Sequence, residues 1–449
     1  MKIKTIGVAC FLFSALCAHA RFIYDPSAQT ITDDEKIWTF KVSLNKNTAD
    51  KLTVDGTGCE FAGTELCSLN LTEISSSDGE KRYYAVSFKA LPAAAKPYLT
   101  EFIAPDCQKI EGDGCFRDCK ELVTVKLNET AGVAYLGSQS FMSCTKLENF
   151  TPRKLGVDYL YGNTFRSCSS LDGGFELPSC RQIRDRAFGD CVKLEWISAP
   201  ELTMVGEAAF SGCSSLSSVS VQKVSQICNS AFSNCSSLSD ESLKRLLPGG
   251  IEYLGSNAIA NQEYLFSGCT ALTGPVVWDF PSLKTNVVAQ GMFKGCSNLK
   301  EVAIVSDVAE IKAYAFENIA PGASVYMPLT APAVYGIKAV SRGTAPYPRL
   351  YLKDNHDAWF AAIGKKHQVL LRGRVNDPTW TSTTTTTDFK KMRIRMSSDE
   401  TMCTVKKSNG QITEVTLLDK NILAFVAYND ESYLWVLKMP EQGFRVIVR

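Results

Sequence analysis

The sequence is poor in histidine, in net charge and in long hydrophobic runs. Only three of its 449 residues are histidine, and two of these, His356 and His367, lie beyond the first twenty residues. Neither has the spacing of an H-E-x-x-H zinc motif, and the chain contains no G-x-S-x-G elbow and no P-loop. The sequence therefore predicts a protein that is not an enzyme and that uses no cofactor and no metal.

The balance of charges excludes a second group of functions. The chain carries 48 basic and 47 acidic residues, which gives a formal net charge of +1. Proteins that bind nucleic acid or a membrane surface through charge have a marked basic excess. No apolar run after the first twenty residues reaches eighteen, the length that a transmembrane helix needs. We therefore expect no nucleic-acid partner and no transmembrane segment.

The first twenty residues have the order of a secretory signal peptide. Lys2 and Lys4 precede the apolar stretch "IGVACFLFSALC", which the small residues "AHA" (18–20) follow. This order predicts cleavage after Ala20. The mature protein is then secreted or held at the cell surface.

Cysteine is abundant, and most of it follows a repeat. Of the 17 cysteines, Cys10 and Cys17 lie in the predicted leader. Among the remaining 15, eight belong to the string F-x-x-C-x-x-L, whose copies follow one another at steps of 22 to 34 residues. A ninth copy, at Phe316, has Ile319 in place of cysteine. The commonest steps lie within the period of about 20–29 residues that is typical of leucine-rich repeats.

Each repeat unit predicts a strand and a turn. After the repeat leucine, apolar residues alternate, as in Leu216, Val219 and Val221, which indicates a short strand. The stretch "AAF…C" on the other side of the unit predicts a helical or 3₁₀ turn. One unit cannot bury its own apolar face, so the units are expected to stack into a solenoid with a continuous core.

The repeat resembles a known family. The segment "LSSVSVQKVSQICNSAFSNCSSL" (216–238) is similar to the BspA-like leucine-rich repeat, and the resemblance covers roughly residues 101–320. It implies an α/β repeat fold, a right-handed solenoid with one β-strand and one short helical turn per coil. It also implies a secreted or cell-surface protein with an adhesin-type role.

Composition divides the chain into five predicted parts. Within the repeats, "DESLKRLLPGG" (240–250) predicts an inserted surface helix with Asp240 as its N-cap. Alternating runs outside the repeats, such as "IWTFKVSL" (37–44), predict small β-rich domains at both ends. The predicted parts are the signal peptide 1–20, a β-rich N-terminal region 21–96, the repeats 97–323, a solenoid cap 324–363 and a β-rich C-terminal domain 364–449.

The repeat cysteines are expected to be buried structural thiols. Eight cysteines at one phase cannot each have a catalytic histidine nearby, and a ladder of parallel side chains strains an inter-coil disulfide. "CFRDC" (115–119) has zinc-like spacing, but Cys115 falls where other copies have alanine. A local disulfide between Cys59 and Cys67 is plausible in an oxidising compartment. The predicted thiol ladder comprises Cys119, Cys144, Cys168, Cys191, Cys213, Cys235, Cys269 and Cys296.

The strand face is the expected binding surface, because stacked repeats form extended concave surfaces. Trp196 is its most informative residue, since an outward tryptophan is a common interface anchor. One hypothesis is an exported protein that binds an extracellular protein or a glycan. The alternative is a structural component of the cell envelope with the solenoid as a spacer. The residues predicted to point outward are Phe102, Thr124, Lys126, Asn149, Thr151, Trp196, Ser198, Ser218, Ser220 and Glu301.

Overall fold

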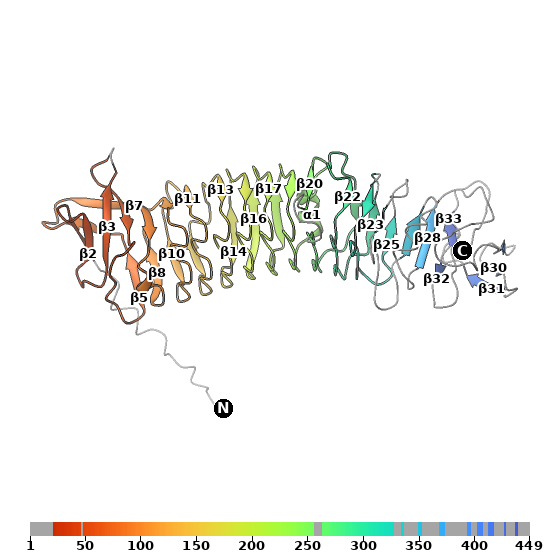
Figure 1. Cartoon of the computed structure of the whole chain (residues 1–449), viewed down its shortest axis with the longest axis horizontal. Helices are drawn as coiled ribbons and strands as arrows, with labels where there is room; N and C mark the ends of the chain where they lie inside the picture. Colours follow the sequence, from red (N-terminus) through yellow and green to blue (C-terminus); the bar gives the residue numbers. More distant parts are fainter. Residues whose placement is uncertain are drawn as a thin grey trace, which may run out of the picture. The chain divides into compact units, whose positions relative to one another are not determined.

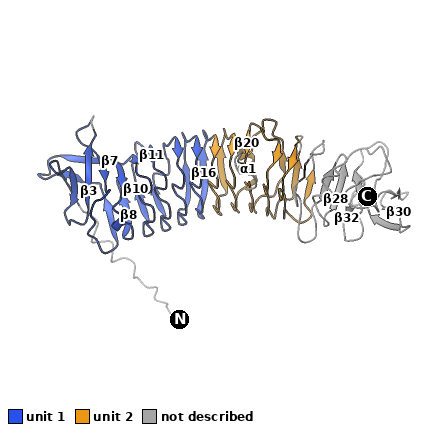
Figure 2. Ribbon diagram, in the orientation of Figure 1, with its two compact units in different colours: residues 1–202 blue, residues 203–449 orange. Residues whose placement is uncertain are grey.

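The structure is a computed structural model that describes residues 21–326, apart from 46–47, 256–262, 305 and 307. Beyond residue 326 it describes only the course of strands β26 to β33. The chain divides into two compact units, residues 1–202 and 203–449 (Figure 2). No helix among the described residues is long and apolar enough to cross a membrane.

Unit 1 begins with a closed ring of six strands. The strands follow one another in the order β7-β4-β3-β2-β1-β6, and β6 pairs with β7 to close the ring. Buried and exposed residues alternate along them, and Phe22, Phe40 and Phe88 fill the interior. The ring is formed by β1 (Phe22–Asp25), β2 (Thr30–Asp33), β3 (Thr39–Leu44), β4 (Lys51–Asp55), β6 (Ile74–Ser76) and β7 (Arg82–Ala90).

The coils of unit 1 continue from this ring through parallel strands (Figure 1). One sheet has the order β12-β10-β8-β5, and β7 of the ring extends to β9 and β11. Further along, β14 pairs with β16 and β13 pairs with β15. The elements are β5 (Cys67–Asn70), the 3₁₀ turn η1 (Ala93–Ala95), β8 (Leu99–Ile103), β9 (Lys109–Ile110), β10 (Thr124–Lys126), β11 (Tyr135–Leu136), β12 (Asn149–Thr151), β13 (Tyr159–Leu160), β14 (Gly173–Glu176), β15 (Gln182–Ile183) and β16 (Leu194–Ala199).

Unit 2 is built from the same kind of coil, with one helix among its described residues. Parallel pairing joins β17, β19 and β20, then β21, β23, β25, β27 and β28, and also β22, β24 and β26. Its described coils comprise β17 (Met204–Val205), β18 (Ser218–Val221), β19 (Gln226–Ile227), α1 (Asp240–Leu246), β20 (Tyr253–Leu254), β21 (Val276–Trp278), β22 (Val287–Val288), β23 (Glu301–Ile304), β24 (Glu310–Ile311) and β25 (Ser324–Tyr326).

The last strands of unit 2 change from parallel to mixed pairing. β29, β30 and β31 form an antiparallel sheet, while β28 pairs with both β32 and β33. These strands are β26 (Val334–Tyr335), β27 (Arg349–Leu352), β28 (Gln368–Arg372), β29 (Arg393–Met396), β30 (Met402–Lys406), β31 (Ile412–Thr416), β32 (Val426–Ala427) and β33 (Val436–Lys438).

The predicted domain boundaries remain predictions. Seven strands lie within the region 21–96 that was expected to be β-rich. Hydrogen-bonded pairs nevertheless join it to the repeats, because β5 pairs with β8 and β7 pairs with β9. The predicted signal peptide of residues 1–20 lies outside the described residues, as do His356 and His367.

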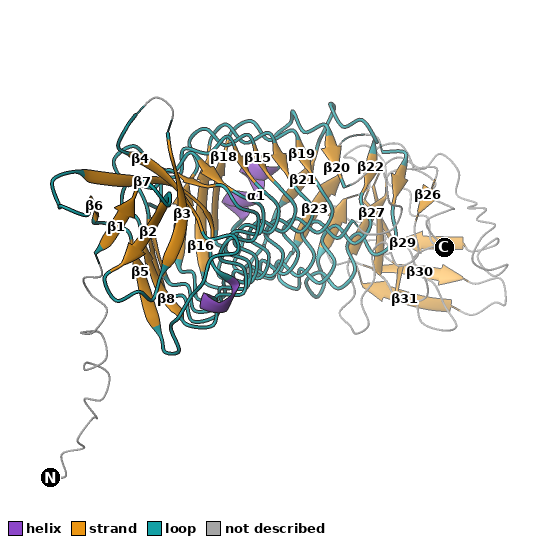
Figure 3. Ribbon diagram, turned by 60° about the vertical axis from the view of Figure 1, so that its left-hand side comes forward, coloured by secondary structure: helices purple, strands orange, loops and turns teal. Residues whose placement is uncertain are grey.

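The prediction of a helical turn in every coil is wrong. The segment around each repeat phenylalanine is a series of turns, drawn as loops in Figure 3. Around Phe141, for example, Gln139 has a φ of 58° and Ser143 a φ of 63°. A positive φ at both positions interrupts a right-handed helix. The backbone N–H groups here bond to the next coil instead, as Ser143 N does to Arg166 O at 2.8 Å.

Stacked phenylalanine rings form the centre of the core in each unit. In unit 1 the ring centroids of Phe116 and Phe141 lie 5.2 Å apart with 3° between the ring planes, and those of Phe141 and Phe165 lie 5.5 Å apart. In unit 2 the Phe210 and Phe232 centroids are also 5.2 Å apart. All five rings are fully buried. The repeat therefore fixes one aromatic ring per coil in a near-parallel row.

Candidate functional site

The structure places most of the predicted outward residues at the surface. Trp196 and Ser198 lie on the same side of β16, opposite the buried Ile197 and Ala199. Their side chains are half-buried. Of the remaining predicted residues, the exposed ones are Lys126, Asn149, Ser218 and Glu301, and the half-buried ones are Thr151 and Ser220.

Two of the predicted residues are not accessible. Phe102 is fully buried, with its ring centroid 4.6 Å from that of Phe116. It lies beside Val125 in the register of β8 and β10, which is an inward position. Thr124 is only 8% exposed, because the longer Glu101 and Asn149 flank it in register. The prediction that these two side chains are available to a ligand is therefore wrong.

A glycine of the neighbouring coil leaves room for Trp196. The register of β14 and β16 shifts between Gly173 and Gly174 and sets Trp196 beside Gly174. A Cβ atom added to Gly174 would lie 2.2 Å from Cδ2 of the indole and 2.2 Å from the Trp196 carbonyl oxygen. Only glycine leaves room for this approach. The indole consequently lies close to the backbone of β14 and is half-buried on the strand face.

The repeat cysteines donate hydrogen bonds from one coil to the previous one. In unit 1, Sγ of Cys144 lies 3.1 Å from the carbonyl oxygen of Phe116, and Sγ of Cys168 lies 3.0 Å from that of Phe141. In unit 2, Cys235 makes the same bond to Phe210 at 3.1 Å. The structure buries all eight cysteines of the predicted ladder, namely Cys119, Cys144, Cys168, Cys191, Cys213, Cys235, Cys269 and Cys296.

Burial also suppresses the chemistry of these thiols. Desolvation raises the pKa of Cys119 and of Cys296 to about 12, and raises that of Cys168 well above its usual range. Because the thiolate is the reactive form, these cysteines are poor nucleophiles and poor metal ligands at neutral pH. No group of three or more His, Cys, Asp or Glu side chains that could hold a metal occurs among the described residues.

The same features recur along the coils: a strand, turns that are hydrogen-bonded to the next coil, a stacked phenylalanine ring and a buried cysteine. Residues 94–174, 174–267 and 254–331 match the family described as "BspA type Leucine rich repeat region". These matches span more than half of the chain. The protein belongs to the BspA-type leucine-rich repeat family.

Solved structures of other repeat proteins are similar to this chain. A T. pallidum leucine-rich repeat protein is 24% identical, with 49% of this chain and 97% of that chain covered and a TM-score of 0.37. A leucine-rich cell surface protein from Faecalibacterium prausnitzii A2-165 is 18% identical, with 74% and 92% covered and a TM-score of 0.35. A comparison with curated proteins finds no match.

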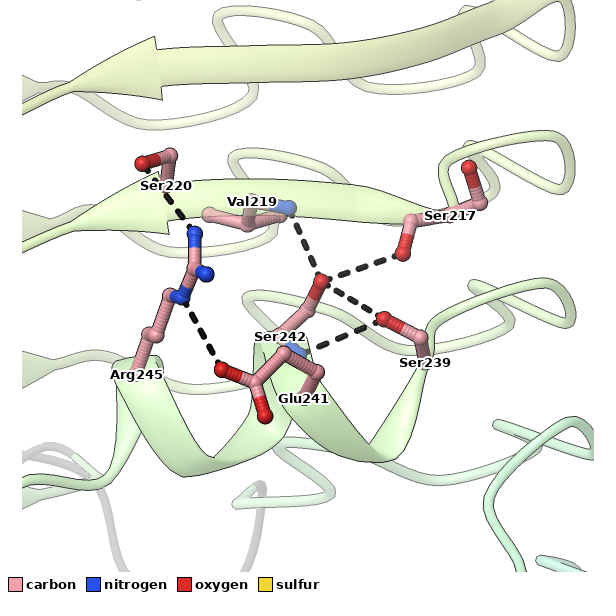
Figure 4. A network of polar contacts seen from close by, with 7 residues as sticks. All are labelled: Ser217, Val219, Ser220, Ser239, Glu241, Ser242 and Arg245. Carbon is pink, nitrogen blue, oxygen red and sulfur yellow. Dashed lines mark hydrogen bonds and ion pairs between the residues drawn. The ribbon is translucent and has the colours of Figure 1, made fainter.

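One helix interrupts the BspA-type coils of unit 2. α1 lies against β18, and Ser242 of the helix bonds to the backbone of that strand (Figure 4). Its Oγ accepts a hydrogen bond from Val219 N at 3.0 Å and donates one to Ser217 O at 3.0 Å. The serine hydroxyl thus takes both roles that a neighbouring strand would have.

The start of α1 differs from the prediction. The N-cap is Ser239, whose Oγ accepts from Ser242 N, and not Asp240. The Asp240 carboxylate instead accepts from Thr273 N at 3.0 Å and from Gly274 N at 3.1 Å, which fixes the start of the next BspA-type coil. Asp240 also lines a groove of about 230 Å³ between α1 and β21.

α1 also engages one of the predicted binding residues. Nη1 of Arg245 lies 3.3 Å from Oγ of Ser220, and its Nε lies 3.4 Å from a carboxylate oxygen of Glu241 (Figure 4). Ser220 is therefore a partner of the helix, whereas Ser218 on the same strand is exposed.

Sequence reasoning missed Arg153, which follows β12. Its guanidinium donates to the carbonyl oxygens of Asp172 at 2.8 Å and Glu148 at 3.0 Å, and it lies over the Phe175 ring at 5.1 Å. Desolvation by burial lowers the pKa of Arg153. Arg153 falls outside the repeated string, so nothing in the BspA-type pattern predicts that its side chain joins these segments.

The predicted disulfide between Cys59 and Cys67 is absent from the structure. Cys67 begins β5 with its side chain buried in unit 1. Cys59 lies in a loop, where its Sγ donates to the carbonyl oxygen of Asp55 at 3.4 Å. The two thiols are thus oriented toward different surroundings.

Proposed function

We propose that this protein is an exported, non-enzymatic binding protein that recognises an extracellular protein or glycan through the strand face of its BspA-type repeats. The observation that carries the proposal is the close approach of the Trp196 indole to Gly174. Tryptophan is enriched among the residues that dominate binding energy. An indole held by a hydrogen-bonded strand keeps its geometry before a ligand arrives, which lowers the entropic cost of binding.

The surroundings of Trp196 support an adhesin-like role. Ser198 lies beside it on β16, and the other strands of the face in unit 1 present Lys126 and Asn149 to solvent. A half-exposed aromatic side chain with polar neighbours is the usual composition of a recognition surface. The leader predicted at residues 1–20 would deliver this surface to the outside of the cell.

Substitution of the anchor tests the strand face. The mature protein, residues 21–449, is measured against an array of extracellular-matrix proteins and oligosaccharides, together with Trp196→Ala. We expect the variant to bind its ligand at least about 30-fold more weakly, as loss of an anchor of about 2 kcal/mol requires. The control is Ile23→Ala, which changes an exposed side chain on β1 of the six-stranded ring. This variant should bind like the wild type.

Two results would contradict this assignment. If Trp196→Ala binds normally while deletion of residues 364–449 abolishes binding, the site lies in the C-terminal region. Export is tested separately by fractionating cells and sequencing the N-terminus of the protein, which should begin at Arg21. A chain that keeps its first twenty residues inside the cell would refute export.

A further inference from the structure

A second cluster of aromatic side chains lies in unit 1, on strands other than those of the strand face. It consists of Tyr135 on β11, Tyr159 at the start of β13, Tyr161 just after β13, and Arg184 just after β15. We name these four residues the tyrosine–arginine cluster. The three tyrosines are half-buried and Arg184 is exposed. A ligand in solvent can therefore reach every member of the cluster.

The rings and the guanidinium are close together. The ring centroids of Tyr135 and Tyr161 lie 5.4 Å apart. Cζ of Arg184 lies 5.4 Å from the centroid of Tyr159 and 5.3 Å from that of Tyr161. Two cation–π contacts therefore hold one cation against two aromatic faces.

The backbone fixes these positions. β13 and β15 are parallel, with Tyr159 beside Gln182 and Leu160 beside Ile183. The N–H of Arg184 donates to Leu160 O at 2.9 Å, which continues the ladder by one residue. The register of β13 and β15 therefore sets the backbone positions of Tyr159, Tyr161 and Arg184 relative to one another.

Arg184 differs from Arg153 in what its guanidinium contacts. Arg153 donates to two carbonyl oxygens of the same unit and is half-buried. The guanidinium of Arg184 has no hydrogen-bond acceptor and no ion-pair partner among the described residues; its contacts are the two tyrosine rings. Its fork of N–H donors matches the two oxygens of a carboxylate. Arg184 is thus positioned and still able to bind an anion.

We propose that the tyrosine–arginine cluster binds an acidic sugar, with the carboxylate on Arg184 and the C–H face of the pyranose ring on the tyrosines. The weakly positive C–H groups of a sugar ring suit the negative face of an aromatic ring. Two rings against one cation, with the Tyr135 ring 5.4 Å from that of Tyr161, favour such a ligand over an acidic peptide, whose carboxylate stands on a flexible aliphatic stem. This site is separate from the strand face and goes beyond the function proposed above.

Charge around the cluster gives the ligand an orientation. The negative charges of Asp113 and Glu111 act on Tyr135. The carboxylate of the sugar therefore belongs at the Arg184 end, and an uncharged part of the sugar at the Tyr135 end. A polysaccharide with one carboxylate on every sugar unit is predicted to bind with a single sugar unit in the cluster.

The test uses trigalacturonate and sialyllactose as acidic sugars, measured by calorimetry on the mature protein. The uncharged controls are the methyl ester of trigalacturonate and lactose. We expect each acid to bind about tenfold more tightly than its uncharged control, the difference that one charged hydrogen-bond pair makes. Arg184→Lys and Tyr161→Ala should each weaken binding by about tenfold, whereas Tyr161→Phe keeps the ring and should change it little.

Several outcomes would overturn the proposal. Failure of both acidic sugars to bind, or equal binding of acids and uncharged controls, refutes it. Equal binding of poly-L-glutamate shows a site for carboxylates in general and refutes the sugar. Wild-type binding by both Arg184→Lys and Tyr161→Ala places the site elsewhere. Trp196→Ala should bind the acidic sugars normally, so failure of the strand-face proposal and of this one can be told apart.

Discussion

The repeat cysteine shares a carbonyl group with the coil before it. The carbonyl oxygen of Phe141 accepts the N–H of Cys144 at 3.2 Å in its own coil and the thiol of Cys168 at 3.0 Å from the next. A cysteine fits because it is a small apolar side chain with a weak donor. The thiol therefore fills its place in the core and also links adjacent coils.

Removing this thiol should destabilise the protein. Cys168→Ala leaves a small cavity and removes the bond to Phe141 O, so the free energy of unfolding should fall by about 1–3 kcal/mol. Urea denaturation followed by circular dichroism measures the change. The control is Cys59→Ala, a loop thiol, which should stay within about 0.5 kcal/mol of wild type. Equal stability of the two variants would contradict a structural role for the ladder.

The ladder also predicts sensitivity to high pH. Burial raises the pKa of Cys119 and Cys296 from 9.0 to about 12. Between these values the unfolded chain binds fewer protons than the folded one, so the free energy of unfolding falls as pH rises from 9 toward 12. The stabilisation is fully present below pH 9.

Urea denaturation at several pH values measures this slope. Tyr24 and Tyr135 also have pKa values raised by burial, and they add a slope of the same sign. The double variant Cys119→Ala/Cys296→Ala keeps these tyrosines, so its slope should be smaller than that of the wild type. An unchanged slope would show that the two thiols do not contribute.

Side-chain direction was predictable only where the repeat is regular. The alternation after each repeat leucine correctly places Val219 and Val221 inside and Ser218 outside. The coil of Phe102 has no upstream copy of the string, and Leu99 occupies the place that Leu122 has in the next coil. Counting from Leu99 puts Phe102 inside, where the structure has it. The position of Trp196 beside Gly174 depends on a register shift between β14 and β16. No pattern in a single sequence reveals such a shift.

At the level of elements, the corner turns and α1 show what local sequence could not decide. "AAF…C" resembles a helical segment, but its N–H groups find acceptors in the next coil, and this requires positive φ values that exclude a helix. The helix of "DESLKRLLPGG" was predictable, although its N-cap is Ser239 and not the predicted Asp240. The position of α1 against the edge of β18 depends on Ser242. The helical pattern alone does not show which residue of the helix contacts the strand.

Ser242 should be the critical residue of α1. Ser242→Ala leaves the N–H of Val219 and the carbonyl of Ser217 without the hydroxyl, so the free energy of unfolding should fall by about 1–3 kcal/mol. Ser220→Ala removes only a bond to the exposed Arg245 and should change it by less than about 0.5 kcal/mol. Urea denaturation compares the two. If both variants lose equally little free energy of unfolding, the Ser242 hydroxyl does not take the place of a neighbouring strand at β18.

At the level of the whole molecule, the repeats make each coil depend on its neighbours. Inter-coil hydrogen bonds and ring contacts join consecutive coils within each unit, as between Phe141 and Phe165. In such arrays stability is a sum of local terms, and distant coils respond independently. The period of the coils was readable from the repeated string, but their number was not, because the coil of Phe102 has no copy of the string. Their interruption by α1 was only partly readable, because a 34-residue step shows extra length and not where it packs.

This locality predicts the spread of damage from one substitution. Cys168→Ala should speed hydrogen exchange at amides that bond its coil to the adjoining coils, such as Ser143 N and Ser167 N, by about 5- to 150-fold for a loss of about 1–3 kcal/mol. Amides of a distant coil, such as Gly295 N bonded to Glu317 O, should exchange as in the wild type. Exchange followed by mass spectrometry resolves the two regions. A uniform increase along the chain would mean that the array opens as one cooperative unit, because only global unfolding exposes every coil at the same rate.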